Sequence, residues 1–401
     1  MVPKFLENAK KLGWLVISLD ELIKKQYILD HLDGNHGNLY PRQEELIDEG
    51  VKYISANSIV NGVIDFKKSK FLSQERADKF KKGVAKNGDV IFAHNATVGP
   101  VALLETNDEK VILSTSLTYY RVNSEKINGK YLVQYMSSPN FIRQYEAIMR
   151  QTTRNQLPIT TQRDFLFIIP PIQEQKKIAE ILSTWDKAIE TVEKLVANSQ
   201  QQKKALMQQL LTGQKRLLDD NDVKFGDEWK EVLLGEIAKI TTGSSNRQDS
   251  ILDGEYTFFD RSEDIRTSNI YLFDCEAIIV GGEGQDFIPK YFEGKFDLHQ
   301  RTYAIMDFQN YDGKFLYYMI YHFRNYFLSQ AVGSTVKSLR LPMFQKMSLK
   351  VPSIKEQEKI AQVLTLADRE IDLYQQQLDK LKLEKKALMQ QLLTGQKRVR
   401  I

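Results

Sequence analysis

The strongest constraint on the fold is an internal repeat in the amino-acid sequence. The segment 203–216 (KKALMQQLLTGQKR) recurs letter for letter as 385–398. The same offset aligns the residues that follow Pro170 with those that follow Pro352, without a gap. Solenoid repeats are about 20–50 residues long. The spacing between these copies is several times greater, which predicts a duplicated unit of domain size.

The repeated segments have the pattern of long helices. Neither copy contains Gly or Pro between its opening proline (Pro171, Pro352) and its closing glycine (Gly213, Gly395), as expected for uninterrupted helices. Apolar residues recur at three-four spacing, which predicts a heptad seam, and a long helix with one apolar stripe needs a partner. We expect the two copies to pair antiparallel as a coiled coil, with a pseudo-twofold repeat; two separate helical hairpins or an intermolecular coil remain alternatives. The predicted seam residues are Ile178, Leu182, Trp185, Ile189, Leu206, Leu210, Ile360, Leu364, Ile371, Leu378, Leu388 and Leu392.

The sequence outside these helices predicts two globular units of mixed α/β (α+β) structure. The expected order is a globular domain at 1–169, a helix at 170–216, a globular domain at 217–351 and a helix at 352–401. The starts of the two units match weakly, for example Trp14 with Trp229, and the offset between these matches is larger than the offset between the helices. The first globular unit is therefore longer than the second, and we expect much of the additional length in the loop 33–42. Strands are predicted at 90–92, 101–104, 111–113, 117–122, 277–280 and 301–306, and single helices at 130–149 and 314–330.

Composition and missing motifs exclude several classes of protein. One cysteine, Cys275, makes no internal disulfide and suits a reducing compartment, so we expect a cytoplasmic protein; no apolar run is long enough to span a bilayer. The formal net charge is only +4, so any nucleic-acid binding must come from local patches. The sequence lacks a GxxxxGK[ST] phosphate loop, a GxGxxG fingerprint and the Asn/Asp-Pro-Pro-Tyr/Phe motif of amino-methylating DNA methyltransferases. His31 and His36 with Asp30 and Asp33 fit a polar surface loop better than a metal site. We expect a reader or scaffold with no catalytic residues and no bound metal.

Two diverged units joined by nearly identical helices suit the reading of two different DNA sequences at a fixed separation. Polar turns occur at matching positions, 151–157 (QTTRNQL) and 333–339 (GSTVKSL). Arg suits guanine edges or phosphates, Asn and Gln suit adenine edges, and hydroxyls suit phosphates; an ordinary surface role remains the alternative for each residue. The candidate DNA-binding residues are Asn57, Arg76, His94, Asn95, Thr97, Arg143, Arg150, Thr153, Arg154, Asn155, Arg247, Arg261, Glu283, Gln285, Lys290, Gln300, Arg301, Ser334, Thr335 and Lys337.

The chain resembles the specificity subunit of type I restriction–modification enzymes over nearly its whole length. The resemblance lies in the helix entries PPIQEQKKIAEIL and VPSIKEQEKIAQVL, the duplicated LLTGQKR ends and the Gly-Ser-Thr turn at 333–335; the first unit has Gln151–Thr153 there instead. It implies that 1–169 and 217–351 are target-recognition domains, each binding one half of a bipartite double-stranded DNA site. It also implies that the helices set the spacer and dock two methyltransferase subunits, and that restriction/translocase subunits join the complex.

The resemblance further implies that this chain is not an enzyme. S-adenosylmethionine, ATP and Mg would be bound by the partner subunits, and no cofactor by this chain. A coiled-coil adaptor that joins proteins without contacting DNA is the main alternative, and a self-contained nuclease or methyltransferase is disfavoured by the missing motifs.

Overall fold

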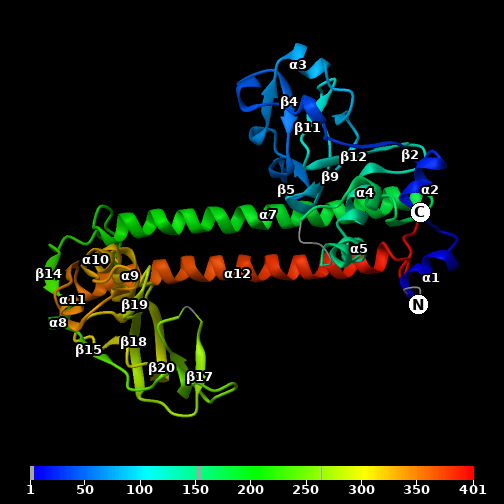
Figure 1. Cartoon of the computed structure of the whole chain (residues 1–401). Coiled ribbons are helices and arrows are strands. Elements are labelled where there is room, and N and C mark those ends of the chain that lie inside the picture. The colour runs from blue at the N-terminus through cyan, green and yellow to red at the C-terminus, as the bar shows by residue number, and fades with distance from the viewer. Residues whose placement is uncertain (1–3, 151–154, 263) are drawn as a thin grey trace. The chain divides into compact units, whose positions relative to one another are not determined.

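The computed structural model describes residues 4–150, 155–262 and 264–401. The chain divides into two compact units, the first comprising Met1–Thr191 with Gln377–Ile401 and the second Val192–Gln376. Helix α7 (Ile172–Leu211) begins in the first unit and ends in the second, and α12 (Ile354–Leu392) returns from the second to the first (Figure 1). Each unit therefore contains a globular part and parts of both long helices.

The globular part of the first unit has two main sheets. The four-stranded sheet has the order β10-β9-β12-β2, and the five-stranded sheet has the order β3-β7-β4-β11-β8; β1 pairs with β13 and β5 with β6. The elements are α1 (Lys4–Lys11), β1 (Leu15–Ser18), α2 (Leu19–Lys24), β2 (Ile28–Asp33), η1 (Gly37–Leu39), η2 (Gln43–Glu45), β3 (Leu46–Ile47), β4 (Val51–Ile54), η3 (Ala56–Ser58), β5 (Ile59–Val60), β6 (Val63–Ile64), η4 (Phe66–Lys68), β7 (Lys70–Leu72), α3 (Gln74–Asp78), β8 (Val84–Ala85), β9 (Val90–Asn95), β10 (Thr97–Leu103), β11 (Val111–Leu113), β12 (Leu117–Val122), α4 (Gly129–Met136), α5 (Pro139–Met149), α6 (Ile159–Gln162) and β13 (Leu166–Ile169).

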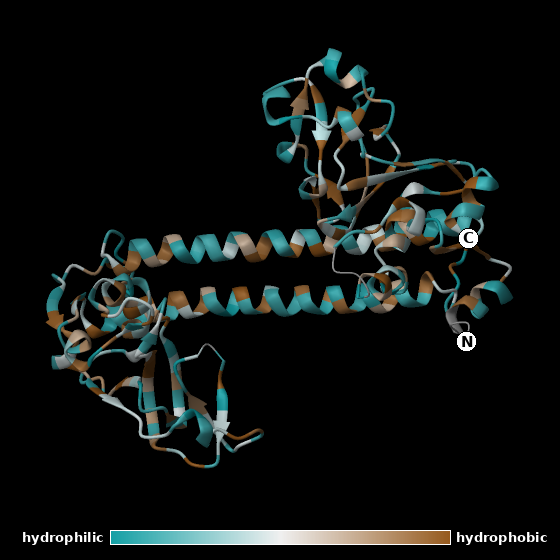
Figure 2. Cartoon of the chain, in the orientation of Figure 1, coloured by the Kyte–Doolittle hydropathy of each residue, from teal (hydrophilic) through white to brown (hydrophobic). Residues whose placement is uncertain are grey.

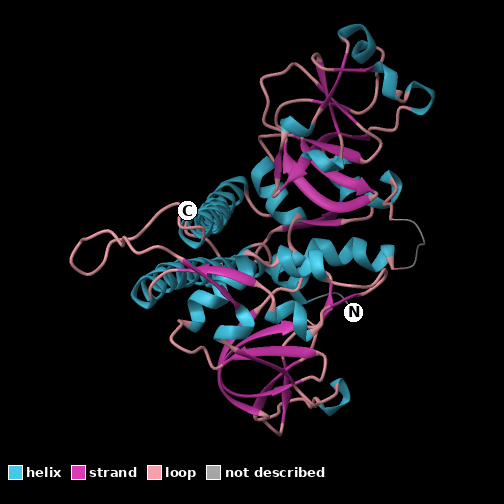
Figure 3. Cartoon of the chain, turned by 90° about the vertical axis from the view of Figure 1, so that its left-hand side faces the viewer, coloured by secondary structure: helices cyan, strands magenta, loops and turns pink. Residues whose placement is uncertain are grey.

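The globular part of the second unit is built on one six-stranded sheet of order β15-β21-β18-β20-β16-β17, with the pairs β14-β23 and β19-β22. Figure 3 shows the strands of each unit gathered into sheets. The elements are β14 (Lys230–Leu233), α8 (Leu234–Ile237), β15 (Lys239–Thr242), η5 (Arg247–Asp249), β16 (Tyr256–Phe259), β17 (Arg266–Ser268), β18 (Phe273–Gly281), β19 (Glu283–Gly284), β20 (Lys290–Leu298), β21 (Thr302–Met306), α9 (Gly313–His322), α10 (Asn325–Gln330), β22 (Lys337–Ser338), α11 (Leu341–Gln345) and β23 (Ser348–Val351).

Three expectations about local structure are corrected. The single helix expected at 130–149 is two helices, because Ser138 caps the start of α5 and Pro139 lacks the N–H that would continue α4. The helix expected at 314–330 is also two, α9 and α10, although no proline or glycine marks the break. The excess length of the first unit is not confined to the loop 33–42, because residues 34–89 separate β2 from β9 and carry strands of the five-stranded sheet, whereas only 243–272 separate β15 from β18.

The two long helices lie antiparallel within each unit. In the first unit Glu174 pairs with Arg398 and Asp186 with Lys385, so the partner number falls as the α7 number rises. The second unit has the same pairs with the roles exchanged: Arg216 with Glu356, and Lys203 with Asp368. Each of these residues is separated from its counterpart by the offset of the sequence repeat. The contacts between the helices therefore repeat along with the sequence.

The apolar stripes of α7 and α12 are visible as alternating brown and teal along both ribbons (Figure 2). Leu182 and Leu392 are buried in the core of the first unit, and Leu210 and Leu364 in that of the second, so the helices share the cores of the globular parts. None of the described helices is long and apolar enough to cross a membrane. Of the predicted seam residues, the buried ones are Ile178, Leu182, Leu210, Ile360, Leu364, Leu378 and Leu392, and the partly buried ones are Trp185, Ile189, Leu206, Ile371 and Leu388.

Candidate nucleic-acid interface

A strand turn and a polar loop meet in the first unit. Strands β9 and β10 are joined at Ala96, which has a left-handed backbone (φ 64°). The N–H of Ala96 donates to the carbonyl of Asn155 at 3.0 Å, and the Asn155 side chain donates to the carbonyl of Ala96 at 3.0 Å. The N–H of Leu157 donates to the carbonyl of His94 at 2.8 Å. We call residues 95–97 together with 155–157 the first tip.

The second unit has an equivalent arrangement. The N–H of Leu339 donates to the carbonyl of Gly282 at 2.8 Å, and β19 pairs with β22 so that Glu283 lies opposite Ser338. We call residues 282–284 together with 337–339 the second tip. Leu157 and Leu339 are related by the offset of the sequence repeat, so the same position of the repeat makes the same main-chain hydrogen bond in both units.

A further main-chain contact establishes which residues correspond. The N–H of His94 donates to the carbonyl of Ser116 at 2.9 Å, and the N–H of Gly282 donates to the carbonyl of Arg301 at 2.8 Å. Asn95, next after His94, therefore corresponds to Glu283, next after Gly282. Because these bonds join backbone groups, the two units share one scaffold while the side chains on it differ.

The second tip carries a group of charged residues. Glu283 accepts hydrogen bonds from Arg261 and from Arg301, one at each carboxylate oxygen. Burial alone would raise the pKa of Glu283, but the hydrogen bonds from Arg301 and Arg261 outweigh it and hold the pKa below its usual value. Beside this group is a cavity of about 480 Å³ lined in part by Gln285 and Lys290. The tip thus combines ionised side chains with a recess.

Buried polar side chains support the first tip. Gln162 accepts from Tyr120 at 2.8 Å and lies 3.3 Å from the His31 ring, and its amide donates to Thr118 at 3.2 Å. Thr118 in turn bonds to the His94 ring at 2.8 Å. Burial lowers the pKa of His94, and it lowers that of His31 to about 4. His94 was expected to contact DNA, but its ring is buried in this network.

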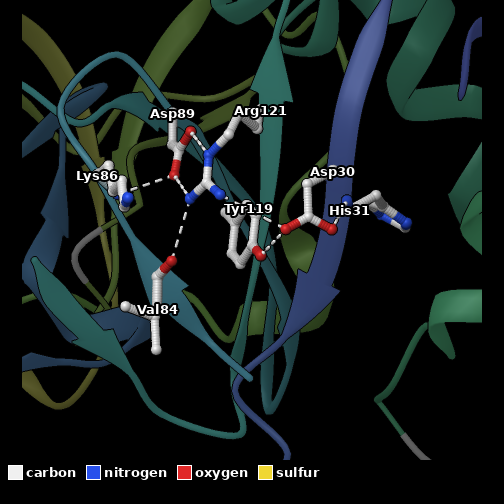
Figure 4. A network of polar contacts seen from close by, with 7 residues as sticks. All are labelled: Asp30, His31, Val84, Lys86, Asp89, Tyr119 and Arg121. Carbon is white, nitrogen blue, oxygen red and sulfur yellow. Dashed lines mark hydrogen bonds and ion pairs between the residues drawn. The ribbon is translucent and has the colours of Figure 1, made fainter. Parts of the chain in front are cut away.

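A second polar network joins the two sheets of the first unit (Figure 4). Arg121 of β12 makes two hydrogen bonds to Asp89, at 2.8 and 3.0 Å, and donates to the carbonyl of Val84 in β8 at 3.1 Å. Its guanidinium also lies over the Tyr119 ring, and the Tyr119 hydroxyl donates to Asp30. A buried carboxylate bound by a fork of N–H donors is a rigid link, so this network fixes one sheet against the other.

The remaining candidate residues are spread over both units. Arg76 of α3 forms an ion pair with Glu45 of η2 at 2.7 Å, and Gln300 donates to Asn246 at 2.6 Å. The Lys290 ammonium donates to the carbonyl of Ser262 at 2.8 Å. Thr153 and Arg154 lie outside the described residues. The exposed candidates are Asn57, Thr97, Arg143, Arg150, Asn155, Arg247, Arg261, Gln285, Gln300, Arg301, Ser334, Thr335 and Lys337, while Arg76, Asn95, Glu283 and Lys290 are partly buried.

The sequence reasoning missed a second cavity in the second unit. About 690 Å³ in volume, it is lined by Arg247, Arg266 and His299 together with Asn246 and Gln248. Arg266 lies 3.3 Å from Asp260, a buried carboxylate. No local pattern marks Arg266, because its partners come from distant segments. Within 4–150, 155–262 and 264–401, no group of three or more His, Cys, Asp or Glu side chains is arranged to hold a metal ion.

A model of one protein family matches most of the chain. The family is described as "Type I restriction modification DNA specificity domain", and it matches residues 12–198 and 226–383, once in each repeat. The type I restriction enzyme EcoDI specificity subunit of Escherichia coli is 34% identical over 137 residues, which is 34% of this chain and only 30% of that protein. The putative MjaX specificity subunit of Methanocaldococcus jannaschii is 24% identical over 369 residues, 86% of each chain.

Solved structures share the fold. The type I restriction–modification S subunit from M. genitalium superposes with a TM-score of 0.62 at 15% identity, covering 95% of this chain and 96% of that one. A chain from a study of complex assembly and conformational transition of the type I system gives a TM-score of 0.57 at 18% identity, covering 95% and 97%. Specificity subunits are the non-catalytic members of these systems. With both repeats matched, the chain belongs to the family of type I restriction–modification DNA specificity domains.

Proposed function

We propose that this chain reads a bipartite DNA site, with the first tip contacting one half and the second tip the other. One observation carries the proposal: the same main-chain hydrogen bonds, at Leu157 and at Leu339, hold a polar loop against a strand turn in both units, yet the side chains presented differ. A scaffold that is kept while its presented side chains change suits two unlike targets. The target-recognition domains would be 1–169 and 217–351.

The side chains on the tips have the chemistry for this role. The first tip presents Asn95, Thr97 and Asn155, neutral amides and a hydroxyl that suit adenine edges and phosphates. Arg301 lies beside Glu283 of the second tip, and its guanidinium suits guanine or phosphate. The other candidates would supply the contacts to backbone phosphates that fix the register on the duplex.

We further propose that the helices 170–216 and 352–401 set the spacer between the half-sites and dock two methyltransferase subunits. The letter-for-letter repeat of 203–216 in 385–398 offers the same surface twice. Restriction/translocase subunits would join this complex. S-adenosylmethionine, ATP and Mg would be bound by the partners.

Domain exchange tests the proposal. The full chain is co-expressed with its methyltransferase partner, and methylated adenines are mapped across the host genome. Exchanging residues 229–345 with those of a relative is expected to change only one half of the methylated sequence. Inserting one heptad into α7 and α12 together is expected to change the spacer alone. A change in both halves after the exchange would contradict the modular reading.

The protein–protein adaptor is separated by a binding assay. A DNA-reading complex binds its site with an affinity that falls steeply with salt, because phosphate contacts release counterions. An adaptor without DNA contact shows no difference between the methyltransferase alone and the complex.

A further inference from the structure

The charged group at the second tip is assembled from three separate segments of the second unit. Arg261 follows β16, Glu283 lies in β19, and Arg301 precedes β21. Each arginine donates through Nη1 to a different oxygen of the Glu283 carboxylate. The three side chains form one unit, which we call the arginine clamp.

Burial within the clamp is uneven. The Glu283 side chain is 14% exposed, whereas those of Arg261 and Arg301 are 49% and 60% exposed. The carboxylate therefore lies beneath the two guanidinium groups and holds each by one edge. Within the part of the chain that the structure describes, no hydrogen bond is made by the other side-chain N–H groups of these two arginines, and each side chain is about half exposed.

The backbone is shaped to bring the clamp together. A Cβ on Gly282 would lie 2.6 Å from the carbonyl oxygen of Arg301, so the backbone of the second unit leaves no room for a side chain here, although His94 makes the corresponding main-chain bond in the first unit. With glycine, the N–H of Gly282 donates to that carbonyl at 2.8 Å. This contact places Arg301 directly beside Glu283.

The first unit shows that the scaffold does not need the clamp. The residue corresponding to Glu283 is Asn95, and the residue corresponding to Arg301 is Ser116, since the same two main-chain bonds define both positions. Ser116 uses its hydroxyl locally, with Ser114 and with the N–H of Ala56. The same pair of main-chain bonds thus forms with neutral residues at both positions, so these bonds do not require the charges of the clamp.

We propose that Arg261 and Arg301 are specificity-determining residues that bind guanine in the DNA half-site read by the second unit, and that Glu283 is their positioning residue. The inference rests on the proposed function. A guanidinium presents two N–H groups that match O6 and N7 of guanine in the major groove. Fixing one edge with a carboxylate leaves the other edge oriented, which reduces the rotamer entropy lost on binding. The clamp keeps a net positive charge, because two guanidinium groups share one carboxylate, so it still attracts DNA.

The nearby charges agree with this assignment. Asp260 is engaged by Arg266 and by two hydrogen bonds from Ser262, so it does not compete for the clamp. Lys337 is exposed and lies opposite Gly284 in the β19–β22 pair, where its ammonium suits a backbone phosphate. Asp286 is exposed and lines the 480 Å³ cavity, where its carboxylate would oppose an anionic ligand.

The test uses the full chain in complex with its methyltransferase partner. Methylation rates are measured on duplexes in which each position of the second half-site is varied in turn. The wild-type complex is expected to require guanine at one or two positions. Arg261→Lys and Arg301→Lys keep the charge but lose the fork, and each is expected to lower discrimination at one guanine by roughly ten- to a hundredfold. The first half-site is expected to be unchanged.

Two further variants complete the design. Glu283→Gln keeps both arginines but removes the charge that holds them, and it should lower discrimination at the same guanines by a smaller factor. Arg324→Lys, which changes an arginine that donates to the carbonyl of Tyr321 elsewhere in the unit, is the matched control and should change nothing.

The outcomes separate the hypotheses. If the wild-type complex showed no sequence preference, the proposed function itself would be refuted before any variant is made. A wild-type site without guanine in the second half-site would overturn only the clamp inference. If the arginine variants instead lowered the methylation rate equally on all duplexes, with a weaker salt dependence, the arginines would be binding phosphates, and the clamp inference would also be overturned. Lysine variants with unchanged discrimination would do the same.

Discussion

Arg216→Met is expected to destabilise the second unit strongly. The Glu356 side chain is completely buried, and Arg216 binds it through two hydrogen bonds of 2.6 Å each while also donating to the carbonyl of Asp227. Removing the arginine leaves a buried, unpaired carboxylate. Breaking such a pair costs about 3–5 kcal/mol, and we expect a loss of about 4 kcal/mol in the free energy of unfolding.

The internal repeat supplies the control. Arg398 makes the corresponding pair with Glu174, but its side chain is 52% exposed, against 16% for Arg216. Water reaches Glu174 more easily once that arginine is gone, so Arg398→Met should cost clearly less. Replacing both partners, Arg216→Met with Glu356→Met, should recover most of the lost stability, because no charge is then left buried.

Urea unfolding of the full chain, followed by far-ultraviolet circular dichroism, measures these differences as shifts of the midpoint at a constant slope. The reasoning fails if Arg216→Met and Arg398→Met are equally destabilising, or if the double variant is less stable than Arg216→Met alone. Either result would mean that the buried carboxylate is not the source of the cost.

Three other predictions concern the two cores. Burial lowers the pKa of His31 to about 4, so between about pH 6.5 and about pH 4 the unfolded chain binds a proton at this residue and the folded chain does not. The free energy of unfolding should therefore drop by roughly 3 kcal/mol as the pH falls through that window. His31→Gln should remove this part of the pH dependence of the urea midpoint. Gln162→Phe introduces the residue found at the corresponding position of the second unit, Phe344, but leaves several buried polar groups without a hydrogen-bond partner. It should therefore lower the free energy of unfolding by about 3 kcal/mol. An unchanged free energy of unfolding would contradict the role of the network. Leu364→Ala, at a fully buried position, should cost about 2–5 kcal/mol, whereas Leu366→Ala, at a position 55% exposed, should stay within about 0.5 kcal/mol; similar thermal shifts for the two would argue against the observed burial.

The helices and their pairing were predictable because the information is local and repeated. Proline, glycine and a heptad pattern define α7 and α12, and the duplicated LLTGQKR segment shows that the two copies share one environment. The polar turns at 151–157 and 333–339 were found by the same offset, so one of the two segments of each tip was located from the sequence.

The side-chain groups on the tips were not predictable as groups. Arg261, Glu283 and Arg301 were each candidates for their chemistry, but nothing in the sequence says that they meet, because they come from three strands and loops. The network around Gln162 was missed for the same reason. The burial of the His94 ring could not be foreseen, because a histidine near the end of a strand can face either the core or solvent.

The tethers at Leu157 and Leu339 have an evolutionary consequence. Leu157 and Leu339 donate through the backbone, so exposed neighbours whose side chains take no part in the contact can change without removing these bonds; Gly282 and Asn155 are exceptions, because a Cβ on Gly282 would clash with Arg301 and the Asn155 side chain is itself bonded to Ala96. Point mutations at those exposed positions should therefore change the chemistry that each loop presents with little penalty to folding.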